Sequence, residues 1–292
     1  MLTMKSLFGI VLLVVLVEGS SKKGVVHWAD SYMCDDFEIL NNMTWWFDFR
    51  MSLDYFHEKN ICKSSIDNYK HNYVPMVWGY WSDTKIFIDD AAEFVLGFNE
   101  PNHVEQSNMS PEKAAAAWKE VEKHSKGKPL VSPSAAVCGK NCRSTEIEWF
   151  DKFFELCKDC RVDYLATHTY WCNANKTMTY LESLFKRYGR KIWLTEFACG
   201  ESPYELEQLN YMKDMLPRLE AADYIYRYAW YRARLTKSGF ITTAASLLKK
   251  DRSELTELGR LYNNYQGETS TYHNKVNIYF GNSVYQRQEY IA

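Results

Sequence analysis

The segment FVLGFNEPNHVEQSNMSPEKAAAAWKEVEKHSK, residues 94–126, contains one complete strand–loop–helix unit. Its first residues, 94–100, are largely apolar on both faces, as expected for a strand buried in a parallel sheet. Ser110 followed by Pro111 is typical of a helix start, because serine caps free N–H groups and proline fits the first helical position. The segment therefore predicts a β-strand and an α-helix joined by a loop that begins at Glu100.

Units of this kind recur along the chain. Thr145 with Glu148 predicts a capping box before one helix, and Gly189 predicts the end of another. Ser202, Pro203 and Glu205 predict the same kind of start for a further helix, in the segment that begins at Tyr204. Between the helices, the other strands are predicted at 24–30, 44–50, 73–79, 129–136, 162–171, 191–198 and 224–233.

Eight strands alternating with helices over about 240 residues predict an α/β protein with a single (β/α)8 TIM barrel domain. A doubly wound open sheet is the alternative, but no glycine-rich phosphate loop follows the first strand. We assign the barrel to residues 22–266. Residues 267–292 fall outside the alternation and are assigned to a short C-terminal tail of unknown structure.

The first 21 residues are predicted to be a secretory signal peptide. Lys5 precedes an apolar run from Leu7 to Val17, which small residues follow at 19–21. The run is too short for a comfortable transmembrane span, although an anchor or a buried first helix is the alternative. We therefore expect a secreted, extracellular protein that is free of the membrane once the signal peptide is removed.

Charge and aromatic content bound the possible partners. The chain carries 35 basic and 37 acidic residues, a formal net charge of −2, which does not indicate a nucleic acid or an anionic membrane as partner. Aromatic residues make up 16% of the chain, with 10 Trp and 21 Tyr. They indicate either a heavy core or flat platforms on which the C–H bonds of a sugar ring pack.

Two further features are typical of an exported protein. The cysteine count is even, and disulfide bonds form in oxidising compartments. Cys138–Cys142 and Cys157–Cys160 are close enough to form local loops, and Cys34–Cys62 with Cys172–Cys199 would then be the long-range pairs, although the sequence does not fix this connectivity. Zinc binding is the alternative for CGKNC and CKDC. The cysteines are Cys34, Cys62, Cys138, Cys142, Cys157, Cys160, Cys172 and Cys199, and the three possible glycosylation sites are Asn42, Asn108 and Asn175.

Glu100 and Glu196 are the candidate reactive residues. Glu100 ends the fourth predicted strand and Glu196 lies near the end of the seventh, and in a barrel both strand ends open onto the same mouth. Two carboxylates across a cleft are what glycoside hydrolysis requires, one as proton donor and one as nucleophile. Repulsion between them raises the pKa of one partner, which divides the roles. The alternative is that each is an ordinary surface or loop-bonding residue.

Six motifs in order resemble glycoside hydrolase family 128, the endo-β-1,3-glucanases among the retaining barrel glycosidases of clan A. The resemblance extends from Gly24 to Tyr265, whereas the cysteines and the tail are not part of it. The motifs are GFNEPN (97–102), VSPSAA (131–136), HTYW (168–171), WLTEFA (193–198), YAWYRA (228–233) and SLLKKDRSELTELGRLY (246–262).

The resemblance implies a secreted, retaining endo-β-1,3-glucanase that acts on β-glucan polysaccharide or oligosaccharide and needs no metal and no organic cofactor. We expect a monomer. An enzyme of the same clan acting on β-1,4-glucan, mannan or xylan is one alternative. A non-catalytic β-glucan-binding protein and a structural secreted glycoprotein are the others.

The resemblance also implies roles for single residues. Glu100 would be the general acid/base and Glu196 the nucleophile that forms a glycosyl-enzyme. Asn99 would bind the sugar 2-hydroxyl, unless it only stabilises the turn before proline. Tyr170 would donate a hydrogen bond to the nucleophile, unless it packs in the barrel wall.

The remaining candidates are substrate-binding side chains. Trp230 would form the floor beneath the sugar at the cleavage point. His168 would orient a neighbouring side chain or a substrate hydroxyl, with a buried core histidine as the alternative. Trp28, Trp78, Trp81 and Trp171 are further candidate platforms, each of which could equally be structural.

Overall fold

The computed structural model of the chain describes residues 20–27 and 31–267. The predicted signal peptide and C-terminal tail lie almost entirely outside these ranges, as does Trp28. Within them, no helix is both long enough and apolar enough to cross a membrane.

The strands form a closed parallel barrel. β1 pairs with both β2 and β7, which gives the order β2-β1-β7-β6-β5, and β3 pairs with β4. A bridge from Val131 to Tyr164 joins β4 to the start of β5. The strands are β1 Lys23–Val26, β2 Trp45–Phe47, β3 Val95–Leu96, β4 Leu130–Val131, β5 Leu165–Thr169, β6 Ile192–Phe197 and β7 Ile225–Trp230.

The eighth position of the barrel is filled by the strand predicted at 73–79, which is extended but too irregular to be a regular strand. Tyr73 bridges to Trp46 on β2, and Met76 bridges to Leu96 on β3. Pro75 lies between them and has no N–H to donate, which interrupts the ladder. With this segment, all eight predicted strands have a place in the ring and the (β/α)8 barrel is confirmed.

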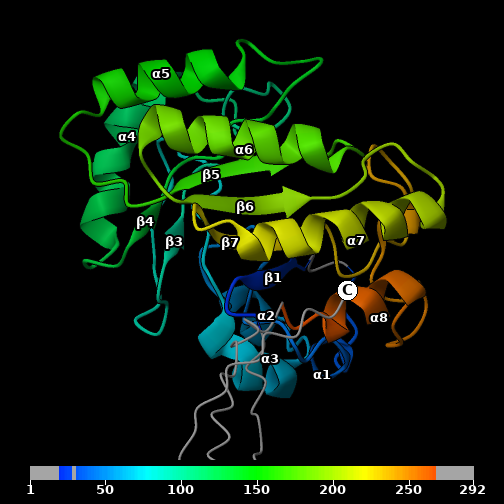
Figure 1. The fold of residues 1–292 in the computed structure, drawn as a ribbon. Coiled ribbons are helices and arrows are strands. Elements are labelled where there is room, and N and C mark those ends of the chain that lie inside the picture. Colours follow the sequence, from blue (N-terminus) through cyan, green and yellow to red (C-terminus); the bar gives the residue numbers. More distant parts are fainter. Residues whose placement is uncertain (1–19, 28–30, 268–292) are drawn as a thin grey trace, which may run out of the picture.

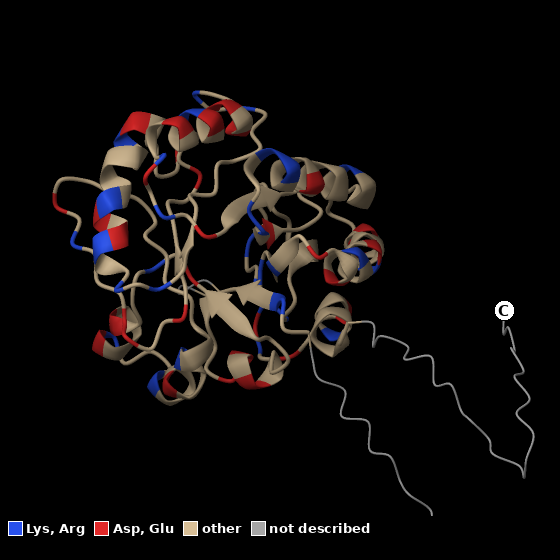
Figure 2. Cartoon of the chain, turned by 60° about the vertical axis from the view of Figure 1, so that its left-hand side comes forward, with Lys and Arg blue, Asp and Glu red and all other residues tan. Residues whose placement is uncertain are grey.

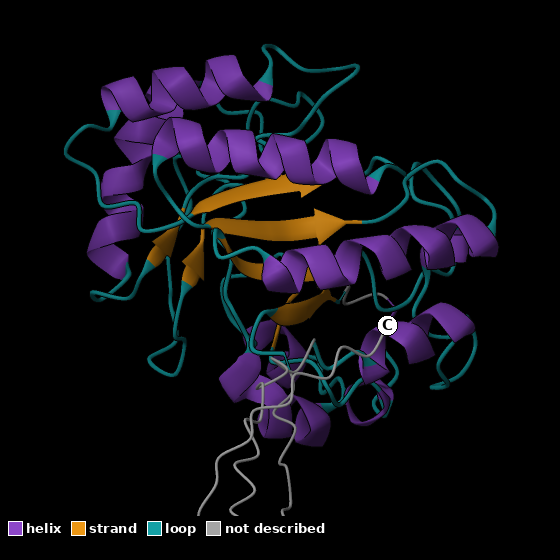
Figure 3. Cartoon of the chain, viewed as in Figure 1, coloured by secondary structure: helices purple, strands orange, loops and turns teal. Residues whose placement is uncertain are grey.

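Helices cover the outside of the barrel, as the views in Figures 2 and 3 show, and charged residues of both signs lie along them. Figure 1 shows α6 and α7 lying along β5 and β6. The helices are α1 Asp36–Ile39, α2 Asp54–Glu58, α3 Lys63–Tyr69, α4 Pro111–His124, α5 Glu146–Leu156, α6 Ala174–Tyr188, α7 Glu205–Ala221 and α8 Glu257–Asn264, with the short 3-10 turns η2 Lys70–Asn72 and η3 Thr243–Ala245.

Most of the predicted helix ends are confirmed. The Ser110 hydroxyl accepts from the backbone N–H of Lys113, and Thr145 forms the capping box with its partner three residues on. Gly189 ends α6 in the left-handed conformation. The prediction for Ser202 was wrong, because Tyr204 occupies the N-cap position of α7 and makes no side-chain cap. Ser202 instead orders the preceding turn by accepting from the Tyr204 N–H.

Two apolar layers stabilise the barrel, and strand alternation decides which side chain enters which layer. Trp45 belongs to the cluster inside the barrel, whereas Trp46 belongs to the layer between strands and helices. On β7, Ala229 faces the interior and Trp230 the outer layer. This alternation has a direct consequence for the site, because an outward-facing residue cannot line the barrel mouth.

The cysteines pair as expected from their spacing. The four disulfides are Cys34–Cys62, Cys138–Cys142, Cys157–Cys160 and Cys172–Cys199. Disulfide formation takes these sulfurs out of any zinc site. Asn42, Asn108 and Asn175 are all exposed, and their glycosylation stays a prediction.

Gly259 allows α8 to approach the loop that precedes it, and this contact provides a test of the packing. A Cβ at this position would lie 1.9 Å from the carbonyl oxygen of Leu247. Because that neighbour is backbone, we expect Gly259→Ala to lower the free energy of unfolding by about 1–3 kcal/mol or more. Thermal or urea unfolding measures this.

Gly139→Ala is the matched control, because nothing lies within 4 Å of the Cβ it would add. Equal stability of Gly259→Ala and Gly139→Ala would contradict the close approach of α8.

Candidate active site

Glu100 and Glu196 lie at the same end of the barrel, where the parallel strands end. Glu196 is on β6, and Glu100 follows β3. The backbone around Glu100 is fixed on both sides, since its N–H donates to Ser134 O (3.0 Å) and the N–H of Asn99 donates to Trp78 O (2.9 Å). Glu100 has a φ of 40°, an uncommon conformation for a residue with a side chain. Strained backbone of this kind occurs at functional sites.

His168, on β5, lies between the two carboxylates. Its Nδ1 is 3.0 Å from Oε1 of Glu100, and its Nε2 is 3.4 Å from Oε1 of Glu196. The second contact is an ion-pair distance rather than an aligned hydrogen bond, and Nε2 makes no hydrogen bond with any described residue. One imidazole ring therefore joins both carboxylates, which places them at a single centre.

Tyr170 makes the two carboxylates unequal. Its hydroxyl donates a hydrogen bond to Oε2 of Glu196. Burial, followed by the negative charge of Glu196, raises the pKa of Tyr170 well above its ordinary value, so the hydroxyl keeps its proton. Glu196 is therefore held by two side chains and is 6% exposed, whereas Glu100 is 16% exposed.

The electrostatics of the centre follow from its burial. Burial raises the pKa of Glu196 to about 7, and the charge of Glu100 adds to the rise, whereas His168, the Tyr170 hydrogen bond and Arg232 oppose it. Burial alone would lower the pKa of His168, but the negative charges of Glu196 and Glu100 outweigh it and raise that pKa. The protonation of Glu196 is therefore coupled to that of His168.

Asn99 and Ser134 bring further polar atoms to the mouth. They are paired across neighbouring strands, and both side chains are buried. Asn99 donates from Nδ2 to Oε1 of Gln106 (3.1 Å). Oδ1 of Asn99 and Oγ of Ser134 have no hydrogen-bond partner among the described residues. Buried polar atoms without partners are rare, and at a mouth of this kind they suit the hydroxyl groups of a ligand.

The structure places Trp230 away from the mouth. It is 0% exposed, and its indole N–H donates to Ala245 O (2.8 Å). Its ring packs against Phe197 (5.0 Å between centroids) and near Tyr262 (6.2 Å). The prediction that Trp230 forms the floor beneath a sugar was wrong, because the alternation of β7 turns this side chain outward and leaves no face open.

The other tryptophans differ in how much ring they offer. Trp78 and Trp81 stack on each other with ring centroids 5.8 Å apart, and Trp81 is 42% exposed. Trp171 has the Nζ of Lys176 lying 3.9 Å from its ring centroid, so one of its faces is already covered. Trp78 and Trp81 therefore offer the more open aromatic surface.

Two aromatic residues at the mouth were missed from the sequence. Tyr231 lies 5.9 Å from the ring of Tyr170, and Phe240 lies 5.4 Å from it and is 59% exposed. Tyr231 directly follows the residue chosen as the floor, so the alternation of β7 was the signal that could have found it. Phe240 lies in the loop after β7, for which no sequence pattern gave a position.

The Cys172–Cys199 disulfide joins the two segments that carry Tyr170 and Glu196. The same turn is held by backbone, since the Gly200 N–H donates to Tyr170 O (2.9 Å). Gln208 on α7 is fully buried and bonds both the N–H (3.2 Å) and the carbonyl (2.6 Å) of Cys199. The loops beyond β5 and β6 are therefore fixed relative to each other.

Comparisons with known proteins agree with the barrel fold. The family model for the glycosyl hydrolase catalytic core matches residues 25–262. A subgroup II endo-β-1,3-glucanase of glycoside hydrolase family 128 from Sorangium cellulosum has a TM-score of 0.73 and 32% sequence identity, over 85% of this chain and 100% of that one. A subgroup I enzyme from Amycolatopsis mediterranei, in complex with laminaritriose, has a TM-score of 0.65 and 25% identity, over 84% and 99%.

A curated relative, alkali-sensitive linkage protein 1 of Schizosaccharomyces pombe, is 29% identical over 178 residues. The match covers 58% of this chain but only 32% of the relative, so the chain matches about a third of that protein's length.

The raised pKa of Glu196 makes a prediction for stability. A carboxyl group with a pKa of about 7 in the folded state, against about 4.5 when unfolded, stabilises the fold below pH 4.5 and loses that contribution as pH rises through 7. We expect Glu196→Gln to reduce the loss of unfolding free energy between pH 5 and pH 8 by up to about 3 kcal/mol. Urea unfolding at several pH values measures this difference. Glu182→Gln on the outer helix α6, where the side chain is 46% exposed, is the control. An unchanged pH dependence would contradict the shift.

The cross-link beside the site makes a second prediction. Cys172→Ser/Cys199→Ser removes a disulfide between residues with a sequence separation of 27, and Cys157→Ser/Cys160→Ser removes one with a separation of 3. The entropy of loop closure predicts losses of about 3–4 and about 2 kcal/mol. We also expect amide hydrogen exchange near Tyr170 and Gly200 to quicken in the first variant only. Equal exchange in both variants would show that the cross-link does not fix the site.

Proposed function

Because the chain belongs to glycoside hydrolase family 128, we propose that it is a secreted, retaining endo-β-1,3-glucanase with Glu100 as general acid/base and Glu196 as nucleophile. The observation that carries the proposal is the single imidazole of His168 in contact with both carboxylates at the barrel mouth. Two carboxyl groups on one sugar are the requirement of glycoside hydrolysis.

The two roles follow from the unequal surroundings. A nucleophile must be fixed in place and ionised when it attacks. The Tyr170 hydroxyl and His168 fix Glu196 and favour its ionised form, although burial still holds its pKa at about 7 and the attacking form therefore dominates only above that pH. An acid/base must exchange a proton with the leaving group and then with water, and Glu100 is the more exposed of the two.

The reaction then has two steps. First, the Glu100 carboxyl gives its proton to the glycosidic oxygen while the Glu196 carboxylate attacks the anomeric carbon, which releases one sugar chain and leaves the other as an ester. Second, Glu100 takes a proton from water, and the hydroxide attacks the same carbon and frees Glu196. Asn99, with its unpaired Oδ1, would hold the sugar 2-hydroxyl in both steps.

Substrate and mode of cleavage rest on the relatives and on the extent of the surface. The Amycolatopsis mediterranei relative, which shares the fold, is an endo-β-1,3-glucanase in complex with laminaritriose, a β-1,3-linked trimer. The exposed indole of Trp81, stacked on Trp78, would extend the substrate-binding surface beyond the sugar unit at the cleavage point. An endo-acting enzyme needs such contacts with several sugar units. Export is supported by the four disulfides and by the predicted signal peptide.

A non-catalytic β-glucan-binding protein is the second candidate. The curated relative bears the name of a linkage protein rather than of a hydrolase. Both carboxylates and their partners are present here, and a protein that only binds glucan needs no such pair. We therefore favour catalysis.

Incubation of the mature protein with soluble β-1,3-glucan tests the proposal. We expect a shortening series of oligomers with retained anomeric configuration, a rise of kcat/KM as pH increases through about 7, and no change on adding a metal chelator. Glu196→Gln should lower turnover by at least about 10³-fold and preserve binding.

Glu100→Ala separates the two roles. It should also lose turnover, but azide should restore cleavage of an aryl β-1,3-oligoglucoside, because an anion attacks the glycosyl-enzyme without a general base. Inverted product would contradict the double displacement. Tight binding of glucan by the wild-type protein without any turnover would instead support the second candidate.

A further inference from the structure

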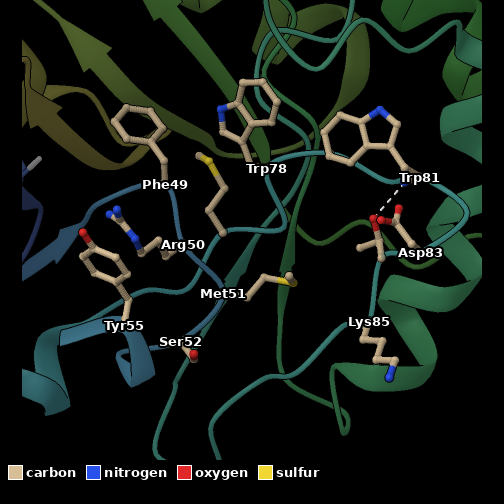
Figure 4. A pocket seen from close by; sticks show the side chains of 12 residues that line it. Phe49, Arg50, Met51, Ser52, Tyr55, Trp78, Trp81, Asp83 and Lys85 are labelled. Atoms are coloured by element: carbon tan, nitrogen blue, oxygen red, sulfur yellow. Dashed lines mark hydrogen bonds between the residues drawn. The ribbon is translucent and has the colours of Figure 1, made fainter. Parts of the chain in front are cut away.

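A pocket of about 460 Å³ lies on one side of the barrel mouth, over the ends of β2 and of the extended segment that follows residue 73. It adjoins the catalytic centre, because its wall residue Trp78 accepts the hydrogen bond from the backbone N–H of Asn99. Figure 4 shows Trp78 and Trp81 along one side, with Phe49, Arg50 and Tyr55 on another. The reaction proposed above uses none of the last three residues.

A bulge at the end of β2, where it pairs with the extended segment after residue 73, forms the wall of the pocket that carries Arg50. The Val74 N–H donates to Trp46 O (2.9 Å), and the Met76 N–H donates to Arg50 O (2.8 Å). In a regular parallel ladder, two steps along one strand match two steps along its neighbour, so Met76 would meet Asp48. Two extra residues are therefore accommodated here, and bulges next to active sites re-aim side chains.

The bulge has a backbone cost at Phe49. Its φ of 68° lies in the left-handed region, which a bulky residue rarely adopts. Glu100, the proposed acid/base, has the same kind of strain at the end of another barrel strand. Strain of this kind persists only where the surroundings enforce it, and it concentrates at functional sites.

The guanidinium of Arg50 is held in place from two sides. Its Nη1 lies 2.8 Å from Oδ2 of Asp48, a fully buried carboxylate whose Oδ1 accepts from the hydroxyl of Tyr73 (2.8 Å). The Tyr55 ring lies 4.3 Å from the guanidinium carbon. Arg50 is nonetheless 32% exposed. A guanidinium that is fixed before a ligand arrives loses little entropy when it donates hydrogen bonds.

The opposite side of the pocket offers an aromatic face. Trp81 folds back over Gly79, where a Cβ would lie 2.4 Å from the indole, so the absence of a side chain at Gly79 allows this position. The pocket therefore combines flat apolar rings with one fixed donor. Asp48 balances the charge of Arg50. The rim carries one acidic and one basic residue, Asp83 and Lys85, whose charges cancel. This chemistry suits a neutral sugar ring, whose C–H bonds pack on indole and whose hydroxyls accept hydrogen bonds.

We propose that this pocket is a subsite for a neutral hexose unit of the substrate chain, distal to the cleaved bond, and that Arg50 is its specificity-determining donor. The inference rests on the proposed function, which identifies the substrate that reaches the pocket as a β-1,3-glucan. It adds that Arg50, and not the catalytic carboxylates, makes the affinity for an oligosaccharide depend on the number of its sugar units.

The test variant is designed around the buried partner. Arg50→Met alone would leave Asp48 buried without its cation, so Asp48→Asn/Arg50→Met is used, with Arg50→Lys as a milder change that keeps the charge but loses the planar fork. All are made in the Glu196→Gln background, and binding of β-1,3-linked glucose oligomers of two to eight units is measured by calorimetry. Arg187→Met, which removes an arginine paired with Asp151 on the outer helices, is the matched control.

In the parent and the control, affinity should rise with chain length. In Asp48→Asn/Arg50→Met, the gain from the longer oligomers should fall by about 10- to 100-fold, with Arg50→Lys between, while the shortest oligomers bind as before. Gly79→Ala, which displaces Trp81, should weaken the same long oligomers. A cooperative thermal transition well above the temperature of the binding assay confirms that each variant is folded.

Several results would overturn the inference. Undiminished affinity for long oligomers would do so, as would an equal loss for short and long ones, because the effect would then not be confined to a distal unit. Tighter binding of a uronic acid oligomer than of the neutral one would refute a neutral subsite. If the wild-type protein cleaves no glucan but length-dependent binding still requires Arg50, the proposed hydrolysis fails and the subsite stands.

Discussion

The shared contact of two carboxylates with one buried imidazole is the constraint on which the site depends. Without His168, Glu100 and Glu196 would face each other with no charge between them in a poorly hydrated space. Like charges in such a place cannot both stay ionised, so the protein has to supply either a proton or a cation. His168 supplies a charge that can be adjusted, because its own pKa responds to the same two carboxylates. The protonation of His168 is therefore coupled to that of the buried Glu196.

A closed barrel provides the geometry for this contact. Glu100, His168 and Glu196 come from three separate strand ends, and no two of them are near neighbours in sequence. Their relative positions are set by the pairing of β5 with β6 and by the ladder that leads through β4 to the residues after β3. The disulfide and Gln208 then hold the loops beyond the strand ends. Rigid strands fix the spacing, and short loops fix the direction of each side chain.

Much of this could be predicted from the sequence, for reasons that are local. The helix start at Ser110 and the capping box at Thr145 depend on hydrogen bonds within four residues, and both are confirmed. Strand position was read from apolar runs, which is why all eight strands have a place in the ring.

The direction of a side chain at a strand end was harder to predict. Trp230 was expected at the mouth, but the register of β7 turns it toward α7 and α8. A shift of one residue selects Tyr231 instead, and apolar content alone does not fix that choice.

The features that sequence patterns missed altogether arise where the regular ladder is broken. The bulge before Arg50 depends on how two strands that are distant in sequence pair, and no window of the sequence around Phe49 contains that information. The backbone strain at Phe49 and at Glu100 has the same origin, since each residue follows a buried strand whose pairing is already fixed. A regular strand would carry its side chains to alternate faces of the barrel wall and end there. Departing from regularity at the last residues turns Glu100 and Arg50 toward the mouth, and the surrounding hydrogen bonds offset the local cost. The barrel supplies stability through regular pairing, and its chemistry lies at the few positions where that pairing ends.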